Sequence, residues 1–343
     1  MNKTINENEK AILATALCIS VLDRGFLLLA AMIALMGWLV MACRMMSDKH
    51  PILDLASHLS WHTWVSLSVV AFPTCVSLRV CVGEKRLRWF HRLLMATPPW
   101  LYLTWITAPW TMLPLALNDS EAKGLKILSW NIWIMSSSPE EALSLLKESD
   151  ADVIALIELG PEQTRVLKQL EKIYPYCLWM PDESSRGIAV LSRIEGTRFT
   201  SVDLANEGMP AIEADVPPTE SHSGYRIMAV HTRSPDLHQR TLDRNKQLQA
   251  LAEWAALPNK ASIIIGDLNV TPWSPPFSRL LQQGNLEDSR RYRGNFASWP
   301  TDLGPFAIPI DHALVPRNSQ VLFRGVGASA PDSDHRPIIV VLK

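Results

Sequence analysis

The sequence of 343 residues is poor in cysteine, carries almost no net charge, and contains no internal repeat or low-complexity stretch. Five cysteines, four of them in the first third, exclude a disulfide-built scaffold. An apolar content of 48%, gathered partly in long uncharged runs, excludes a disordered or collagen-like chain. The length is about twice that of an ordinary domain, which indicates two structural parts.

The near-neutral total conceals an uneven distribution of charge. Up to Leu117 there are 10 Lys and Arg against 6 Asp and Glu, a net charge of +4. The remainder has 23 against 28, a net charge of −5. We therefore expect an N-terminal membrane region over residues 1–117 and a catalytic domain over residues 118–343, joined at about residues 118–124.

Three uncharged runs in the first third are long enough to cross the hydrocarbon core of a bilayer as helices. They cover residues 25–43, 59–78 and 93–117, with 19, 20 and 25 residues. Buried helices of a soluble core are the alternative, but the runs lack the polar face of a soluble helix. Residues 11–22 are apolar but too short to cross, and we interpret them as an interfacial or extended start of the first helix. The sequence thus predicts about three transmembrane helices.

The distribution of basic residues predicts the orientation of these helices. The linker between the second and third runs holds five basic residues, whereas the first linker holds only Arg44 and Lys49. The positive-inside rule puts the richer linker in the cytoplasm. The catalytic domain is then extracytoplasmic, or periplasmic, on a multi-pass protein of the inner cell membrane. The five basic residues are Arg79, Lys85, Arg86, Arg88 and Arg92.

After residue 124, short β-rich runs alternate with helical ones, which predicts a layered α/β domain covered by helices on both sides. The expected helices cover residues 139–148, 161–173 and 235–257. The expected strands cover residues 125–131, 153–158, 187–192, 211–216, 225–231, 262–266, 310–315 and 337–342.

Polar residues end six of these strands or immediately precede the last one. Each alone has an ordinary explanation, such as a turn, a surface acid or a hydrogen-bonded strand-end histidine. The ordered set is harder to explain in this way, because a carboxylate that finishes an apolar strand is costly unless something satisfies it. The set comprises Asn131, Glu158, His231, Asp267, Asn269, Asp311, Asp334 and His335.

In order and spacing, residues 126–343 resemble the endonuclease/exonuclease/phosphatase superfamily, which includes DNase I-type nucleases and neutral sphingomyelinases. Residues 186–193 resemble the Gly-x-Ala-x-Leu-Ser-Arg strand of that family. The membrane helices and the segment 269–275 resemble the bacterial membrane-anchored branch typified by the YafD and VanJ proteins. The resemblance implies a four-layer α-β-β-α sandwich and divalent-metal-dependent hydrolysis of phosphoester bonds.

The resemblance and the chemistry of the side chains imply the same metal site. Glu158 would hold Mg²⁺, with Mn²⁺ as the alternative, and Asn131 would lie beside it. Asp334 would join a second metal position. The sequence departs from the family pattern in one place: Glu158 is followed by Leu159 and Gly160, where many relatives have a polar residue. The sequence therefore does not define which residues form the adjacent wall of the pocket.

The remaining residues would carry the catalytic roles. Asp267 would orient or deprotonate the attacking water, and Asn269 would donate to a non-bridging oxygen. Asp311 would hydrogen-bond His335, which would relay a proton or stabilise the pentacovalent state. His231 is a candidate general acid for the leaving oxygen.

The acidic domain and the membrane region favour a lipid or lipid-linked phosphate or pyrophosphate as substrate. A membrane-tethered endonuclease or exonuclease is the alternative, although nucleic acid binding normally needs a cationic surface. The basic cluster of Arg290, Arg291 and Arg293 is interpreted as a solvated loop, with contact to phosphate as the alternative. A catalytically inactive membrane binding module is a third hypothesis, which the complete set of site residues disfavours.

Overall fold

The computed structural model describes residues 7–47, 50–80, 83–110, 123–258, 261–327 and 332–343. The chain forms two compact units. The first comprises Met1–Met46 and Leu59–Thr107, and the second comprises Ser47–His58 and Ala108–Lys343. The division differs from the expected boundary at residue 117, because Ser47–His58 and the described residues 108–110 belong to the second unit. Residues 118–122 of the expected joint lie outside the described residues.

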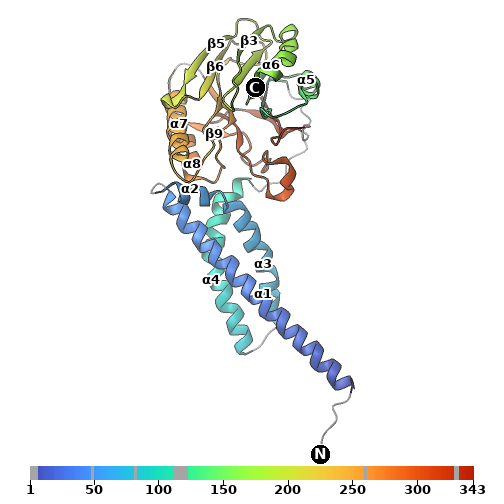
Figure 1. The fold of residues 1–343 in the computed structure, drawn as a ribbon. Helices are drawn as coiled ribbons and strands as arrows, with labels where there is room; N and C mark the ends of the chain where they lie inside the picture. Colours follow the sequence, from blue (N-terminus) through green and yellow to red (C-terminus); the bar gives the residue numbers. More distant parts are fainter. Residues whose placement is uncertain (1–6, 48–49, 81–82, 111–122, 259–260, 328–331) are drawn as a thin grey trace, which may run out of the picture. The chain divides into compact units, whose positions relative to one another are not determined.

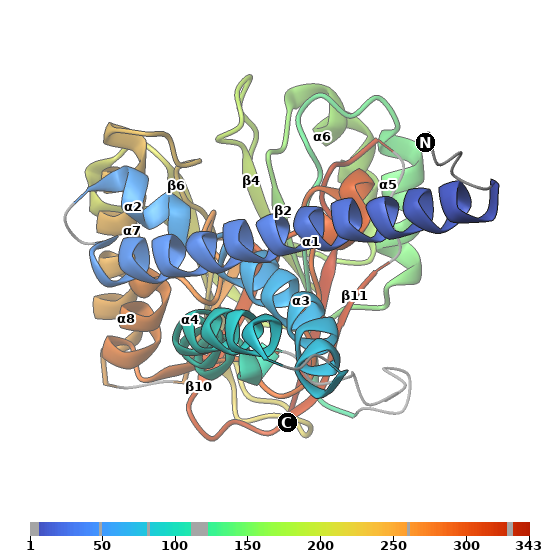
Figure 2. The same ribbon diagram turned by 90° about the horizontal axis from the view of Figure 1, so that it is seen from below.

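Three long helices build the first unit: α1 (Glu7–Met45), α3 (Ser60–Val80) and α4 (Glu84–Thr107). Figure 2 shows α3 and α4 side by side. Residues 11–22 form the start of α1, as the sequence indicated.

Only one stretch of the described residues is long and apolar enough to cross a membrane, Arg24–Met45, with a mean hydropathy of 2.5. The expectation of about three such helices is therefore not met. Helix α4 begins at Glu84, so that four of the five basic linker residues lie in its first turns, whereas Arg79 lies in α3. Helix α4 ends at Thr107 instead of running to residue 117. Helix α3 carries serine, threonine and histidine at several positions. Residues 111–117 lie outside the described part.

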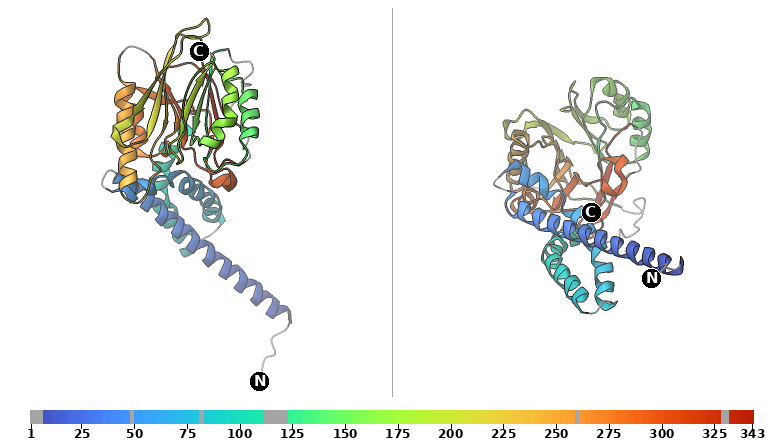
Figure 3. Two further views of the ribbon diagram at one scale, coloured as in Figure 1. Left: turned by 45° about the horizontal axis from the view of Figure 1, so that its top comes forward. Right: turned by 60° about the horizontal axis from the view of Figure 1, so that its bottom comes forward.

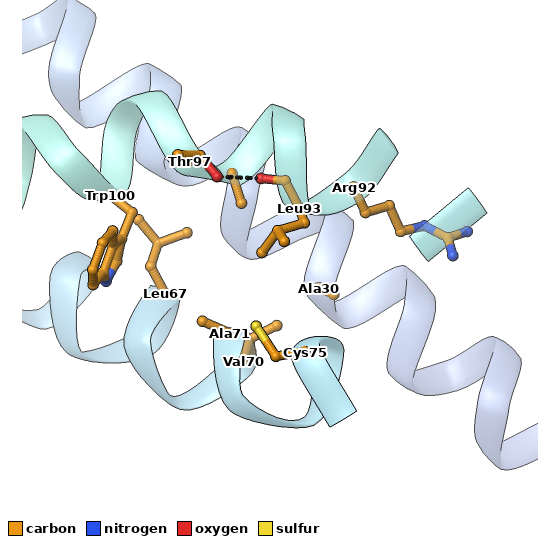
Figure 4. A pocket seen from close by; sticks show the side chains of 10 residues that line it. Ala30, Leu67, Val70, Ala71, Cys75, Arg92, Leu93, Thr97 and Trp100 are labelled. Carbon is orange, nitrogen blue, oxygen red and sulfur yellow. Dashed lines mark hydrogen bonds between the residues drawn. The ribbon is translucent and has the colours of Figure 1, made fainter. Parts of the chain in front are cut away.

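The helices of the first unit pack around Val40, Leu67 and Leu103. An apolar cavity of about 220 Å³ lies among them, and Figure 4 shows the side chains that line it. One end is occupied by Arg92, and Thr97 donates a hydrogen bond back to the carbonyl of Leu93 at 2.6 Å.

Two six-stranded mixed sheets form the second unit. In the first sheet the order is β11 (Val321–Val326), β12 (Ile338–Leu342), β1 (Leu125–Asn131), β2 (Val153–Ile157), β4 (Ile188–Ser192) and β3 (Tyr176–Met180). In the second sheet it is β5 (Arg198–Asp203), β6 (Pro210–Val216), β7 (Tyr225–His231), β8 (Ser262–Asp267), β10 (Asp311–Pro316) and β9 (Leu286–Asp288).

The sheets pack face to face with helices on both outer faces, as the left view of Figure 3 shows. Helices α5 (Pro139–Glu148) and α6 (Pro161–Leu167) cover the first sheet, and α7 (Gln239–Ala255) and α8 (Pro275–Gln283) cover the second. The layers therefore follow the order α-β-β-α that the family resemblance implied. A short helix, α2 (Pro51–Ser57), belongs to the same unit and lies beside α7 (Figure 1).

The eight expected strands are all present, with ends within one or two residues of those expected. Strands β3, β5, β9 and β11 and helix α8 were not predicted from the sequence. Strand β5 is largely exposed and β9 has only three residues, so neither shows a clear apolar pattern.

Candidate active site

Strand pairing brings the ends of distant segments together at one edge of the two sheets. In the first sheet β1 and β2 are parallel, and Asn131 at the end of β1 pairs with Ile157, the residue before Glu158. In the second sheet β7 runs parallel to β8, where His231 pairs with Asp267. Strand β10 runs antiparallel to β8 and pairs Asp311 with the same Asp267.

Asn131 bridges the two sheets through its side-chain amide. Its Nδ2 donates to Oε1 of Glu158 at 3.2 Å and to Oδ2 of Asp267 at 3.3 Å. Its Oδ1 accepts from the backbone N–H of Trp133 at 3.1 Å. In this arrangement the amide nitrogen of Asn131 faces both carboxylates.

Glu158 follows β2 in a left-handed backbone conformation, with φ at +57°. A non-glycine residue there costs on the order of 1–3 kcal/mol, and such residues cluster at functional sites. The turn directs the carboxylate toward His231, whose Nε2 lies 3.7 Å from Oε1 of Glu158.

Asp267 lies at the centre of the cluster and is almost completely buried. Burial, together with the neighbouring charge of Asp311, raises the pKa of the Asp267 carboxyl to about 6. Its Oδ1 accepts from the backbone N–H of Asn269 at 2.9 Å. Its Oδ2 lies 3.8 Å from Nε2 of both His231 and His335. A carboxylate with a pKa near neutrality is suited to exchange protons at physiological pH.

His335 and Asp311 form a buried pair, with Nδ1 of the histidine 2.8 Å from Oδ2 of the aspartate. Burial acts to lower the pKa of His335, but the charge and hydrogen bond of Asp311 outweigh it and raise that pKa to about 9. Burial would raise the pKa of Asp311, yet the charge of His335 holds it below the usual value. The pair is therefore an imidazolium and a carboxylate at neutral pH.

His231 presents one ring nitrogen to the site. Its Nδ1 lies 2.9 Å from the carbonyl oxygen of Ser185, and a carbonyl only accepts, so Nδ1 carries the proton of that bond. The other nitrogen, Nε2, is buried without a hydrogen-bond partner among the described residues. That atom faces Glu158 and Asp267 and remains available to a ligand.

Asn269 and Asp334 complete the predicted set. Asn269 has φ at +49°, and its Nδ2 donates to the carbonyl of Thr232 at 2.9 Å. Oδ2 of Asp334 accepts from Nε1 of Trp299 at 2.8 Å, whereas its Oδ1 is buried without a partner among the residues described.

These side chains surround a cavity of about 310 Å³. Of the eight predicted residues, Glu158, Asp267, Asn269, Asp334 and His335 line it directly. Asn131 and His231 contact Glu158 or Asp267, and Asp311 holds His335. The walls also contain residues that the sequence analysis did not identify: His58, Trp133, Ser234, Pro235, Trp299, Ile308 and Ile310.

The site suits a divalent cation. The carboxylates of Glu158, Asp267 and Asp334 face one cavity, and such a concentration of negative charge is expensive without a counter-ion. The unpartnered Oδ1 of Asp334 points to the same need. Ligand atoms of Asp267, Asp311 and His335 also lie within 4.8 Å of one another. In the pair described above His335 is an imidazolium, and an imidazolium has no lone pair for a metal.

Two sequence interpretations change in detail. Leu159, after Glu158, is fully buried, and its N–H donates to the carbonyl of Gly187 at 3.0 Å, so the neighbouring wall is formed by Trp133 instead. Arg290 is not part of a solvated loop, because it is fully buried and paired with Asp288 at 2.6 Å.

Several solved structures share this fold. A Neisseria 3′ phosphatase, NExo, bound to a product DNA hairpin is 20% identical over 64% of this chain and 99% of that one, with a TM-score of 0.53. A functionally unknown conserved protein from Enterococcus faecalis is 17% identical over 64% and 99%, with a TM-score of 0.51. Humanized TDP2 from D. rerio is 16% identical over 65% and 100%, with a TM-score of 0.52. No curated protein sequence matches the chain.

Residues 128–335 match the Endonuclease/Exonuclease/phosphatase family, which is more than half of the chain. The match extends from β1 to His335 and so includes every residue of the cluster described above. The chain therefore belongs to the endonuclease/exonuclease/phosphatase family and is a metal-dependent hydrolase of phosphoester bonds.

Proposed function

We propose that the protein is a membrane-anchored, Mg²⁺-dependent phosphoesterase that hydrolyses a phosphate ester or pyrophosphate of a lipid or lipid-linked substrate. The observation that carries the proposal is the pairing, in one chain, of a complete hydrolytic cluster with an apolar helix of membrane-spanning length, Arg24–Met45. The assignment to the membrane-anchored branch of the family is part of the same proposal.

Glu158 holds the metal ion, Asn131 orients its carboxylate, and Asp334 contributes at the edge of the same cavity. When bound, Mg²⁺, with Mn²⁺ as the alternative, stabilises negative charge on the phosphoryl oxygens and the leaving group. Carboxylate oxygens are the ligands that such a hard cation prefers.

The protein side chains move the protons and hold the charge. Asp267 orients the attacking water and accepts its proton, for which a pKa of about 6 is suitable. His335, kept as an imidazolium by Asp311, donates from Nε2 to a phosphoryl oxygen whose charge increases in the transition state. Asn269 donates to a second oxygen. His231, in its imidazolium form, transfers its Nε2 proton to the leaving oxygen while Nδ1 keeps its bond to the carbonyl of Ser185.

Membrane anchoring is supported by the surface of the first unit. All three of its long helices expose large apolar side chains, for which an aqueous surface offers no partner. Leu35 of α1 is 69% exposed, and Trp105 of α4 is 77% exposed. We propose that Arg24–Met45 crosses the inner cell membrane, with α3 and α4 packed against α1, and that the catalytic domain is extracytoplasmic, the side that the basic residues between the second and third apolar runs favour.

The orientation can be measured with one engineered cysteine. Glu195 is exposed on the catalytic unit, and Glu195→Cys, in a variant whose five native cysteines are replaced by serine, provides a site for a membrane-impermeant maleimide. Labelling of spheroplasts without permeabilisation is expected. Labelling only after permeabilisation would place the catalytic unit in the cytoplasm.

A membrane-tethered nuclease is the second candidate, since a neighbour in fold is bound to a DNA hairpin. A net charge of −5 after Leu117 disfavours it, as does the burial of Arg290, which removes a cation from the basic cluster of residues 290–293. An inactive binding module is disfavoured by the complete set of site residues.

A substrate panel separates these candidates. The full-length protein with Mg²⁺ would be given a polyprenyl diphosphate, a phosphodiester lipid and duplex DNA. Hydrolysis of a lipid substrate is expected, and cleavage of DNA alone would overturn the proposal. Binding of a substrate without turnover would favour the inactive module. Omission of the metal and the variant Glu158→Ala serve as controls for contaminating hydrolases.

A further inference from the structure

The segment between α1 and α3 is part of the catalytic unit, although the sequence analysis assigned it to the membrane region. Within that unit α2 packs beside α7, and His50 caps its start by accepting a hydrogen bond from the backbone N–H of Ile52 at 3.2 Å. The last residue of this segment, His58, lines the same cavity as Asp267 and His335.

The segment is fastened by a buried ion pair. Asp54 pairs with Arg244, and the two side chains are only 1% and 0% exposed. Asp54 also accepts from the hydroxyl of Ser274 at 2.9 Å. Arg244 in turn donates to the backbone carbonyl of Asn269 at 2.8 Å. The anchor of the segment is thus continuous with the loop that carries a residue of the active site.

His58 itself is held by the same loop. Nε1 of the fully buried Trp273 donates to the carbonyl of His58 at 2.8 Å, which fixes the backbone at the rim of the cavity. Its Nε2 is buried and has no hydrogen-bond partner among the residues that the structure describes. A buried polar atom without a partner is costly, so its retention beside a cavity indicates that a ligand satisfies it.

The composition of the cavity wall indicates what that ligand offers. Glu158, Asp267 and Asp334 provide only acceptors, and the N–H of Trp299 is already donated to Asp334. A phosphoryl group needs donors, and the wall has few of them beyond His335 and Asn269. Burial and the charge of Arg244 lower the pKa of His58 to about 4, so its ring is neutral at pH 7 and provides one N–H.

We propose that His58, supplied by the segment between α1 and α3, is a substrate-binding residue that donates a hydrogen bond from Nε2 to a phosphoryl oxygen. The inference rests on the proposed phosphoester hydrolysis and extends it to a residue outside the family match, which begins at residue 128. A loss of this donor weakens substrate binding and leaves the proton transfers intact.

The test compares His58→Phe, which keeps a ring without nitrogen, with His58→Gln, which restores an N–H near the position of Nε2. The full-length protein would hydrolyse bis(p-nitrophenyl) phosphate with Mg²⁺ present. We expect His58→Phe to raise KM about tenfold or more while kcat stays within about threefold of the wild-type value. The loss of one hydrogen bond to a charged group typically weakens binding by about tenfold or more. His58→Gln should recover most of the loss.

The matched control is His50→Phe, the same substitution on the same segment at an exposed residue that does not line the cavity. It should leave KM unchanged. Equal effects of His50→Phe and His58→Phe would overturn the inference, because they would indicate a general loosening of the segment. A wild-type KM in His58→Phe would overturn it as well.

Binding of inorganic phosphate, measured by calorimetry, keeps the inference separate from the proposed function. The inference is supported if phosphate binds the wild type about tenfold more tightly than it binds His58→Phe. If phosphate binds in this way but no substrate is hydrolysed, the proposed function fails and the inference about His58 stands. Equal phosphate affinity in the two proteins, or none in either, would overturn it.

Discussion

Nδ1 of His335 lies 2.8 Å from Oδ2 of Asp311, a residue 24 positions earlier in the chain. The carboxylate fixes which ring nitrogen is bound and leaves Nε2 directed toward Asp267, 3.8 Å away. The pair raises the pKa of His335 to about 9, so a positive donor is present in the site throughout the neutral range.

Asp311→Asn should lower kcat about a thousandfold, because an amide neither stabilises the imidazolium nor fixes its tautomer. Wild-type activity needs His335 protonated and is lost as the pH rises through about 9. Without the anion the pKa of His335 falls, so the alkaline limb of the pH–rate profile should move to lower pH. An unchanged alkaline limb in Asp311→Asn would refute this role, and the exposed Asp302→Asn is the control.

Asp267→Asn should abolish activity and yet stabilise the metal-free protein at pH 8. The pKa of Asp267 is raised from 3.8 to about 6 in the folded state. Protonation of Asp267 therefore adds to the free energy of unfolding, by about 3 kcal/mol at most. This contribution is fully present below about pH 4 and is lost as the pH rises through about 6. In scanning calorimetry with a chelator, Tm of the variant should exceed that of the wild type at pH 8 and approach it at pH 5. A variant less stable than the wild type at pH 8 would contradict this.

Glu158→Ala should weaken the binding of Mg²⁺ or Mn²⁺ at least tenfold by calorimetry, because the carboxylate is the proposed ligand. His335→Gln should retain metal affinity, since its imidazolium offers no lone pair. The reverse pattern, with metal binding lost in His335→Gln and retained in Glu158→Ala, would assign the metal to the cluster of Asp267, Asp311 and His335. Glu195→Ala, at an exposed acid, controls for nonspecific effects.

The strand-end residues could be predicted because their signal is local. An acid or amide such as Asp267 or Asn131 that follows an uninterrupted apolar strand stands out in the sequence, and parallel pairing of β1 with β2 and of β7 with β8 brings such ends to one edge. The order of the residues along the chain then suffices to indicate the family and its layered fold.

Other parts of the site have no local signal. Trp299 and Ile308 lie in an irregular region where tryptophan and isoleucine suggest only packing. Asp54 and His58 lie between two apolar runs and bond to residues about 200 positions later, so only the folded chain brings His58 to the cavity. The burial of Arg290 was missed because it involves a contact with His312 of β10 as well as the nearby Asp288.

Arg290→Ala should destabilise the catalytic unit by about 3–5 kcal/mol, since it leaves the buried carboxylate of Asp288 without its partner. Arg291→Ala, at an exposed neighbour, should change Tm little. If Arg290→Ala instead kept the wild-type Tm and lost affinity for DNA, the basic cluster would be a nucleic-acid contact. That result would favour the nuclease alternative.

The most direct measurement is kcat/KM of the full-length protein with Mg²⁺ on bis(p-nitrophenyl) phosphate for Glu158→Ala, His335→Ala and the double variant. Residues that act in one reaction centre are strongly non-additive. We expect each single variant to lose at least about a thousandfold and the double variant to lose little more. Wild-type rates in either single variant would contradict a shared catalytic site.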